Sequence, residues 1–296
     1  PQTRQMLETA VLNLEIMPSM RALMTAGPAL ERENLSGYNC SFLELNRPKA
    51  FADTLYVLMC GTGLGFSVER QVINKLPEVP KLQYRDQIIK VGDSKEGWSQ
   101  AYWELIQALY EGFIPRSFDV TEVRPAGAPL KTFGGRASGP KPLLDLFYFT
   151  IDKFVQAAGR KLNSIECHDI MCKIGDVVVV GGVRRSAMIS LSNLSDDRMR
   201  VAKSGMWWET EKQRQLANNS IAFTEKPDVL AFMKEFVAIH ESKSGERGIF
   251  SRFGAKKKIA ENGRRNPNYD FGVNPCAEIL LRDQELCNLT EVVRSE

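Results

Sequence analysis

The sequence predicts an α/β fold, and two observations support this prediction. Segments such as 96–112 and 139–159 have the apolar spacing of helices, and the second begins at Gly-Pro and ends at Gly. Short runs of apolar and β-branched residues, such as GFSV and VVVV, lie between the helical segments. Because helices that alternate with short buried strands are typical of βαβ units, we expect mainly parallel strands.

Each helix is predicted from the spacing of its apolar residues and from its end signals. Leu7, Val11 and Leu14 lie on one side of the first helix. Asn163 is a possible N-cap for the fifth. The expected helices are 2–16, 50–59, 96–112, 139–159, 163–176 and 228–244.

The strands are expected in the apolar stretches between these helices. A short strand is expected to follow the glycines of GTGLGFSV (61–68), and SFDVTEVRP (117–125) is a second candidate. VVVV (177–180) is expected to be a buried strand, followed by a glycine turn and another apolar stretch that ends at position 191. EIL (278–280) is expected to be a short strand near the C-terminus.

Composition and charge exclude several classes of protein. The 296 residues are enough for one large α/β domain or two ordinary ones, with 43% hydrophobic and 25% charged residues. The net charge of +3 requires no nucleic-acid partner, and we interpret the basic segment 255–265 as a solvated helix or loop face. There is no signal peptide and no apolar run near the ~20 residues that span a bilayer, so a cytoplasmic location without membrane contact is expected. The first residue is Pro and the last residues form no natural end, so we expect part of a longer protein.

The cysteines are scattered through the chain, as they are in cytosolic proteins that use thiols as core residues, metal ligands or redox groups. Cys167 and Cys172, in CHDIMC, form the one candidate zinc cluster. Their spacing is not that of a CxxC knuckle, and the chain has only two histidines, so no metal site is expected. The six cysteines are Cys40, Cys60, Cys167, Cys172, Cys276 and Cys287.

Three glycine-rich segments mark tight turns or close backbone approaches. GTGLG (61–65) matches part of a dinucleotide fingerprint, but it follows a helical segment, so it is weak evidence for a Rossmann site. The other two segments are 133–140 and 180–187. Arg184 and Arg185, expected on a glycine loop after a buried strand, could contact a phosphate or a base, or could be surface charge.

Asn274, Cys276 and Glu278 alternate in NPCAEIL. If this stretch is extended, the three side chains share one face. A nearby carboxylate raises the pKa of a thiol, which disfavours a nucleophilic thiolate and suits a sulfur that exchanges a hydrogen atom. The asparagine and the glutamate could then hold and deprotonate a sugar hydroxyl. The alternative is a buried cysteine in an edge strand with solvent-facing neighbours.

NPCAE, followed by a second cysteine eleven residues after the first, resembles the active-site loop of ribonucleotide reductases. Four further segments resemble the catalytic subunit of this family in the same order: LEIMPSMRALMTAG with GYNCSF, MCGTGLGFSV, FGGRASGPKPL and VVVVGGVRRSA. Glu278 distinguishes the chain from the glycyl-radical class. The short Cys276–Cys287 separation is most similar to the adenosylcobalamin-dependent class, in its monomeric branch.

This resemblance implies a ten-stranded α/β barrel with a central finger loop. Residues 1–296 would form part of the barrel domain: the first half-barrel, the finger loop at 272–280 and the start of the next strand. The remainder of the barrel would be a required partner, so this stretch alone is expected to be inactive.

The resemblance also implies an activity, the reduction of ribonucleotides to 2′-deoxyribonucleotides for DNA synthesis by a thiyl-radical mechanism. Adenosylcobalamin would generate the thiyl radical on Cys276. Glu278 would be the general base and Asn274 would position the sugar. Cys40 and Cys287 would be the reducing pair and would end as a redox-active disulfide.

Binding roles are implied in the same way. Asn39 and Gly63 would line the substrate pocket through their backbones, and Arg184 and Arg185 match the loop that relays effector identity to the substrate base. The substrate would be a ribonucleoside di- or triphosphate, with a dNTP as a possible effector and a thioredoxin-like protein as reductant.

In the monomeric branch an inserted domain builds the effector site. Only twenty residues separate Cys40 from Cys60, so we expect no room for such a domain in this chain. We therefore expect no effector control through an inserted domain at this position.

Two other functions remain open. One is a non-catalytic nucleotide-binding or assembly fragment of the same ancestry. The other is a thiol–disulfide oxidoreductase that uses Cys276 and Cys287, although it would lack the CxxC typical of that class.

Overall fold

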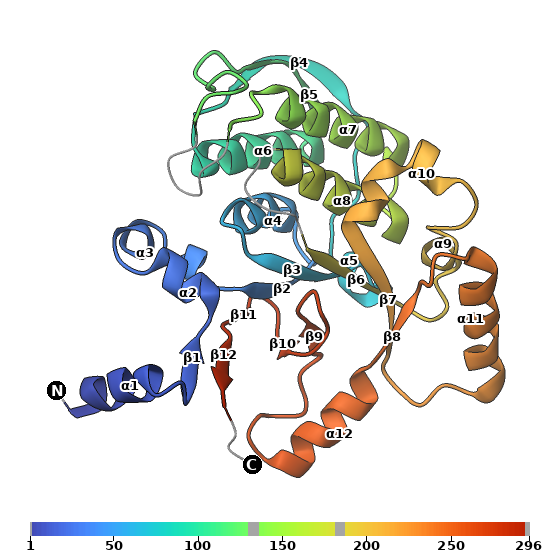
Figure 1. The fold of residues 1–296 in the computed structure, drawn as a ribbon. Helices are drawn as coiled ribbons and strands as arrows, with labels where there is room; N and C mark the ends of the chain where they lie inside the picture. The colour runs from blue at the N-terminus through green and yellow to red at the C-terminus, as the bar shows by residue number, and fades with distance from the viewer. Residues whose placement is uncertain (1, 130–135, 181–186, 294–296) are drawn as a thin grey trace.

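A six-stranded sheet, with strand order β11-β2-β3-β6-β7-β8, forms the centre of the molecule (Figure 1). The computed structural model describes residues 2–129, 136–180 and 187–293. Five neighbouring strands are parallel, as predicted, and only β11 runs antiparallel. The strands are β2 (Cys40–Glu44), β3 (Gly63–Ser67), β6 (Met188–Ser192), β7 (Ala217–Phe223), β8 (Gly248–Ser251) and β11 (Leu286–Cys287).

Helices cover one face of this sheet, which we call the outer face (Figure 1). Helices α4 (Ala50–Met59) and α8 (Ser164–Val180) pack on each other and adjoin the sheet. Behind them lie α6 (Lys95–Tyr110) and α7 (Lys141–Ala157), with the parallel pair β4 (Gln83–Lys90) and β5 (Phe113–Asp119). The larger hydrophobic core lies in these layers and includes Leu55, Phe66, Leu105, Phe147 and Ile170.

The opposite, inner face carries a short antiparallel hairpin of β9 (Gly272–Val273) and β10 (Leu280–Leu281). The hairpin packs on β2 and β3. The apolar cluster beneath it is much smaller than the outer core; it contains Phe42, Ile189, Leu191, Ala222, Phe250, Val273, Leu281 and Cys287.

The other elements lie around this centre. Strands β1 (Ile16–Pro18) and β12 (Thr290–Val292) pair antiparallel, so two segments far apart in the sequence lie side by side (Figure 1). The remaining helices are α1 (Gln2–Leu12), α2 (Met20–Thr25), α3 (Pro28–Arg32), η1 (Asn34–Gly37), α5 (Arg70–Ile73), α9 (Asp197–Arg200), α10 (Trp207–Thr210), η2 (Lys212–Leu216), α11 (Val229–Ser242) and α12 (Arg252–Asn262). None of the helices within the described ranges is long and apolar enough to cross a bilayer.

Five of the six predicted helices are confirmed within a few residues. The first ends at Leu12 and not at position 16, because Leu14 has a positive φ of 59° and β1 begins at Ile16. The predicted strand at 117–125 overlaps β5 only as far as Asp119.

The predicted buried strand at 177–180 is wrong, because α8 continues to Val180. Valine runs favour strands, but propensity is weak compared with tertiary packing. Val178 follows Ile170 and Ile174 at intervals of four residues, and all three are buried in the outer core.

Candidate functional site

The loop between β9 and β10 is a tight turn, so the extended conformation in which Asn274, Cys276 and Glu278 would share one face is not the one that the chain adopts. The Ala277 N–H donates to the carbonyl of Asn274 (2.9 Å), and Ala277 has a positive φ of 65°. The Asn274 side chain closes the turn by accepting from the N–H of Ile279 (3.0 Å). Asn274 is fully buried, whereas Cys276 and Glu278 are exposed at the tip.

Two of the predicted cysteines lie opposite each other on paired strands. Cys40 on β2 and Cys287 on β11 are direct register partners, and both are free thiols. Directly opposed residues have Cβ atoms about 4.5–5.5 Å apart, close to the separation of about 3.5–4.5 Å in a disulfide. Cys276, the partner of Cys287 in the oxidoreductase alternative, instead lies on the turn.

The loop lies against the strands that carry the thiols, because a Cβ on Gly63, the register partner of Cys40, would be 2.9 Å from Pro275. Burial raises the pKa of Cys40, and the charges of Cys276 and Glu278 raise it further. Burial also raises the pKa of Cys287 to about 12, with Cys40 as the next contribution. The structure therefore brings together all five residues predicted to be catalytic.

Three glycines allow the hairpin to lie directly on the sheet. A Cβ on Gly65 would be 1.8 Å from the carbonyl oxygen of Val273, and one on Gly63 would be 2.9 Å from Pro275. A Cβ on Gly272 would be 2.0 Å from the ring of Phe42. The glycines of GTGLG thus make room for the loop. Sequence reasoning missed Gly65 and Gly272, although glycines at positions 63 and 65 share one face of a strand.

The backbones of Asn39 and Gly63 are engaged within the sheet. The Gly63 N–H donates to the carbonyl of Asn39 (3.0 Å), and the Gly63 carbonyl accepts from the hydroxyl of Ser41 (2.9 Å). The Asn39 N–H donates to the carbonyl of Cys287 (3.0 Å). Both residues lie beside the cysteines, and their predicted contact with substrate stays a prediction.

Two side-chain amide atoms at the site are buried without a partner. Within the described residues, Asn39 Oδ1 and Asn274 Nδ2 make no well-formed hydrogen bond, although the Asn274 amide lies near enough to the Cys40 thiol to oppose the rise in its pKa. A buried unpaired donor and acceptor are costly unless a ligand or water satisfies them. This pair suits a ligand that carries hydroxyl groups.

Arg184 and Arg185 lie outside the described residues, so the structure does not test their predicted role in an effector loop. What precedes them is helix α8 and not the strand that was expected.

The candidate zinc cluster lies inside the protein core. Cys167, His168 and Cys172 are completely buried on α8, and the His168 Nε2 donates to Asn219 Oδ1 (2.8 Å). The described part of the chain contains no group of three or more side chains arranged to hold a metal.

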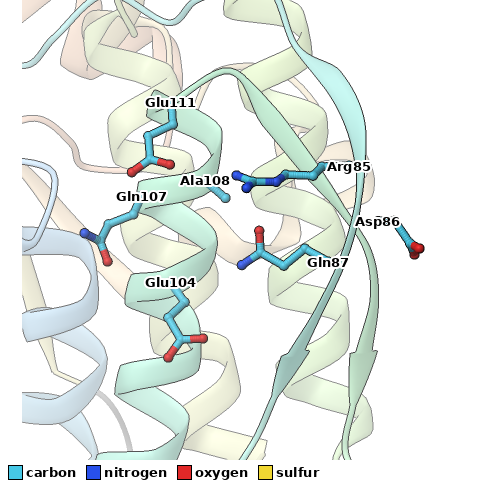
Figure 2. A pocket seen from close by; sticks show the side chains of 7 residues that line it. All are labelled: Arg85, Asp86, Gln87, Glu104, Gln107, Ala108 and Glu111. Carbon is cyan, nitrogen blue, oxygen red and sulfur yellow. The ribbon is translucent and has the colours of Figure 1, made fainter.

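A pocket of about 340 Å³ that none of the cysteines lines lies between β4 and α6 (Figure 2). Glu104, Gln107 and Glu111 come from the helix, and Arg85 and Gln87 reach towards it from the strand. The pocket is open and polar. Its several carboxylates make it a poor match for a phosphate group.

Comparisons with known proteins show which proteins this chain resembles. A family model described as "B12-dependent ribonucleotide reductase, insertion domain" matches residues 71–155. The expectation that the chain has no room for an inserted domain is therefore wrong: the matched segment follows β3 and does not lie between Cys40 and Cys60.

Relatives match along almost the whole chain. The adenosylcobalamin-dependent ribonucleoside-triphosphate reductase of Lactobacillus helveticus is 30% identical, over 97% of this chain and 46% of the relative. The protein of the same name from Lacticaseibacillus paracasei is 31% identical, over 93% and 44%.

A solved structure shares the fold as well. A crystal structure of a B12-dependent (class II) ribonucleotide reductase superposes with a TM-score of 0.78 and 25% identity, covering 96% of this chain and 46% of that one. The chain spans about half the length of the curated relatives it matches.

Proposed function

We propose that this chain, a relative of the adenosylcobalamin-dependent ribonucleotide reductases, carries the thiol site at which ribonucleotides become 2′-deoxyribonucleotides for DNA synthesis. One observation carries the proposal: Cys40 and Cys287 are opposed across paired strands, beneath a loop that presents Cys276 and Glu278. Two thiols that close to a disulfide supply the two electrons and two protons that convert C2′–OH into C2′–H and water. The third thiol remains available for hydrogen-atom exchange.

The positions of the side chains suit these separate roles. Cys276 is exposed at the tip of the loop, so its Sγ can approach the 3′ carbon of a ribose and take its hydrogen. Glu278, exposed on the same turn, would accept the proton of the 3′ hydroxyl. Asn274 is fixed by its bond to Ile279, and its buried Nδ2, which makes no well-formed hydrogen bond, would donate to a sugar hydroxyl.

Adenosylcobalamin fits the exposed thiol of Cys276, and when bound it would supply the radical that activates this sulfur. Among the described residues, Cys276 is the cysteine that is exposed, while Cys40 is half-buried and Cys287 is buried. This arrangement would direct the radical to Cys276 and keep the reducing pair shielded.

We infer that the substrate is a ribonucleoside triphosphate, because the relatives are named triphosphate reductases. A diphosphate substrate remains the alternative. Asn39 Oδ1, buried and unpaired beside Cys40, would accept a hydrogen bond from the substrate. A thioredoxin-like protein in the cytoplasm would reduce the Cys40–Cys287 disulfide.

We also propose that the central sheet is half of a ten-stranded barrel, with 272–280 as its finger loop. Five parallel strands with a hairpin on the inner face are consistent with this, as is the likeness to a solved class II enzyme. An open sheet edge favours further strand pairing. The other half-barrel would come from the part of the relatives that this chain does not span.

Segment 71–155, matched by the insertion-domain model, is our candidate for effector control by a dNTP. Helix α7 of this segment packs on α8, and Lys153 pairs with Asp169 (3.3 Å). Helix α8 leads directly into the segment that carries Arg184 and Arg185. A signal could therefore pass from the inserted segment through α8 to the substrate base.

The test is turnover of the four ribonucleotides, as di- and triphosphates, with adenosylcobalamin and dithiothreitol. It is run on this chain and on a longer polypeptide that also contains the part of the relatives that this chain does not span, which we call the complete polypeptide. The Cys276→Ser variant is made in the complete polypeptide. We expect deoxynucleotide from the complete polypeptide, more than 10³-fold less from Cys276→Ser, and none from this chain alone.

Other results would point to other functions. Disulfide reduction without any deoxynucleotide would replace the proposal by a thiol–disulfide oxidoreductase. Nucleotide binding without turnover in the complete polypeptide would indicate a non-catalytic fragment. Turnover that requires a separate radical-generating subunit would show that adenosylcobalamin is not the cofactor, while the proposed roles of the three cysteines would stand.

A further inference from the structure

The base of the Cys276 loop is held at the other end of the hairpin by a buried arginine. Arg252, the first residue of α12, donates from Nε to the carbonyl of Phe271 (2.8 Å), one residue before β9. Its Nη1 and Nη2 donate to Glu69 Oε1 (2.8 Å) and Oε2 (2.7 Å). The two side chains are 3% and 1% exposed.

Glu69 is itself fixed to the sheet. It follows β3 closely and accepts from the hydroxyl of Ser67 (2.8 Å) and the amide of Gln71 (2.9 Å). One guanidinium group therefore connects the end of β3 to the strand that begins the loop. An arginine suits this task because its planar donors can serve a carboxylate and a carbonyl together.

Besides the Arg252 bond, the hairpin is held by the buried side chains of Val273 and Leu281 and by Arg265, whose Nη1 donates to the Leu280 carbonyl (2.6 Å). Gly63, Gly65 and Gly272 allow close approach but contribute no side chain of their own. The tip is exposed, and the hairpin has only two residues in each strand. The position of the tip thus depends strongly on how its base is held.

We propose that the buried Glu69–Arg252 pair is a positioning device that fixes the Cys276 loop over Cys40 and Cys287. The assignment of a catalytic role to this loop rests on the proposed function above. The side-chain bonds of Glu69 and Arg252 go to each other, to Ser67, to Gln71 and to Phe271, so the pair would act through Phe271 and the hairpin.

The test compares two variants of the complete polypeptide. Removing one partner would leave a buried unpaired charge, so the main variant replaces both, Glu69→Gln with Arg252→Met. The matched control is Lys256→Met, one helical turn further along α12, where Lys256 Nζ pairs with Asp270 (2.6 Å) at the same loop base but is more exposed.

The first measurement uses the protein's own cysteines and needs no turnover. Native protein is alkylated with iodoacetamide, and each cysteine is quantified by peptide mass spectrometry. In the double variant we expect Cys40 and Cys287 to react at least tenfold faster. The completely buried Cys60, Cys167 and Cys172 should stay protected, which separates loop loosening from global unfolding.

The second measurement is steady-state kinetics. We expect kcat to fall at least 30-fold in the double variant with KM within threefold, because substrate contacts remain while the thiol is displaced. Arg252→Lys keeps the charge but cannot bridge both partners, so an intermediate kcat is expected. In Lys256→Met, the alkylation rates of Cys40 and Cys287 and the value of kcat should stay within twofold of the wild type.

Two results would overturn the proposal. One is unchanged alkylation of Cys40 and Cys287 in the double variant. The other is simultaneous exposure of Cys60, Cys167 and Cys172 in both the double variant and Arg252→Lys, which would make the pair a requirement for the whole fold. If the wild type makes no deoxynucleotide, the proposed function fails, while the alkylation pattern still decides the positioning role.

Discussion

The two faces of the central sheet are built in different ways. The outer face is covered by helices over a large apolar core, in which Phe66, Leu105 and Phe147 are completely buried. The inner face carries one short hairpin over a small cluster, with glycines at the contacts and two amide atoms unpaired. The outer face is built for stability, and the inner face brings reactive groups together at a cost in stability.

Neighbouring residues on β3 show this contrast most directly. Phe66 points into the outer core, and Gly65 lies beneath the Val273 carbonyl on the inner face. Alternation along a strand places them on opposite sides. Substitutions at these two positions therefore test whether stability and activity are separable.

The largest expected effect on stability is that of Phe66→Ala. Removing a fully buried phenyl ring leaves a cavity and should lower the free energy of unfolding by about 3–5 kcal/mol. Chemical denaturation measures the loss. In the complete polypeptide, at a temperature where the variant is still folded, its kcat should lie within about threefold of the wild type; a large fall in kcat would show that the two faces are coupled.

Gly65→Ala should lower kcat strongly and the free energy of unfolding only modestly. The new Cβ would lie 1.8 Å from the Val273 carbonyl, so the hairpin must shift. Overpacking costs about 1–3 kcal/mol, whereas a displacement of about 1 Å at a reacting group can lower turnover about 10²-fold. Wild-type kcat in this variant would show that the hairpin tolerates displacement.

The sequence predicted the outer layers better than the inner site. Helix periodicity at 50–59 and 139–159 reflects a continuous apolar stripe, which is a local property. The valines at 177–180 were mistaken for a strand because their helical state depends on the partners of α8.

The site residues were predicted from chemistry and family resemblance, but their geometry was not. The Asn274-Pro275 pair is a turn signal that the sequence reasoning did not use, whereas the left-handed Ala277 has no simple sequence signal. Contacts between residues far apart, such as Glu69 with Arg252, 183 positions away, depend on the folded topology. The approach of Val273 to Gly65 is likewise visible only in three dimensions.

The smallest expected effect is on the pH dependence of stability, and it concerns two thiols that lie in different surroundings. Burial raises the pKa of both Cys287 and Cys60 to about 12. Cys287 faces Cys40 on the inner face, while Cys60 lies beside Lys95 (3.4 Å) and is completely buried. A free cysteine has a pKa near 8.5, so at that pH each has a thiolate fraction roughly 10³-fold lower.

Between pH 7 and 10, the alkylation rate of Cys287 should rise about tenfold per pH unit without a plateau, and should exceed that of Cys60 at every pH. The unfolded chain releases the Cys287 proton near pH 8.5 and the folded chain retains it, so stability falls as the pH rises from 8.5 towards 12. Denaturation at pH 8 and pH 10 should therefore show a loss about 2 kcal/mol larger in the wild type than in Cys287→Ala. A plateau near pH 9 would mean that Cys287 is solvated, and that the inner site is more open to water than the structure shows.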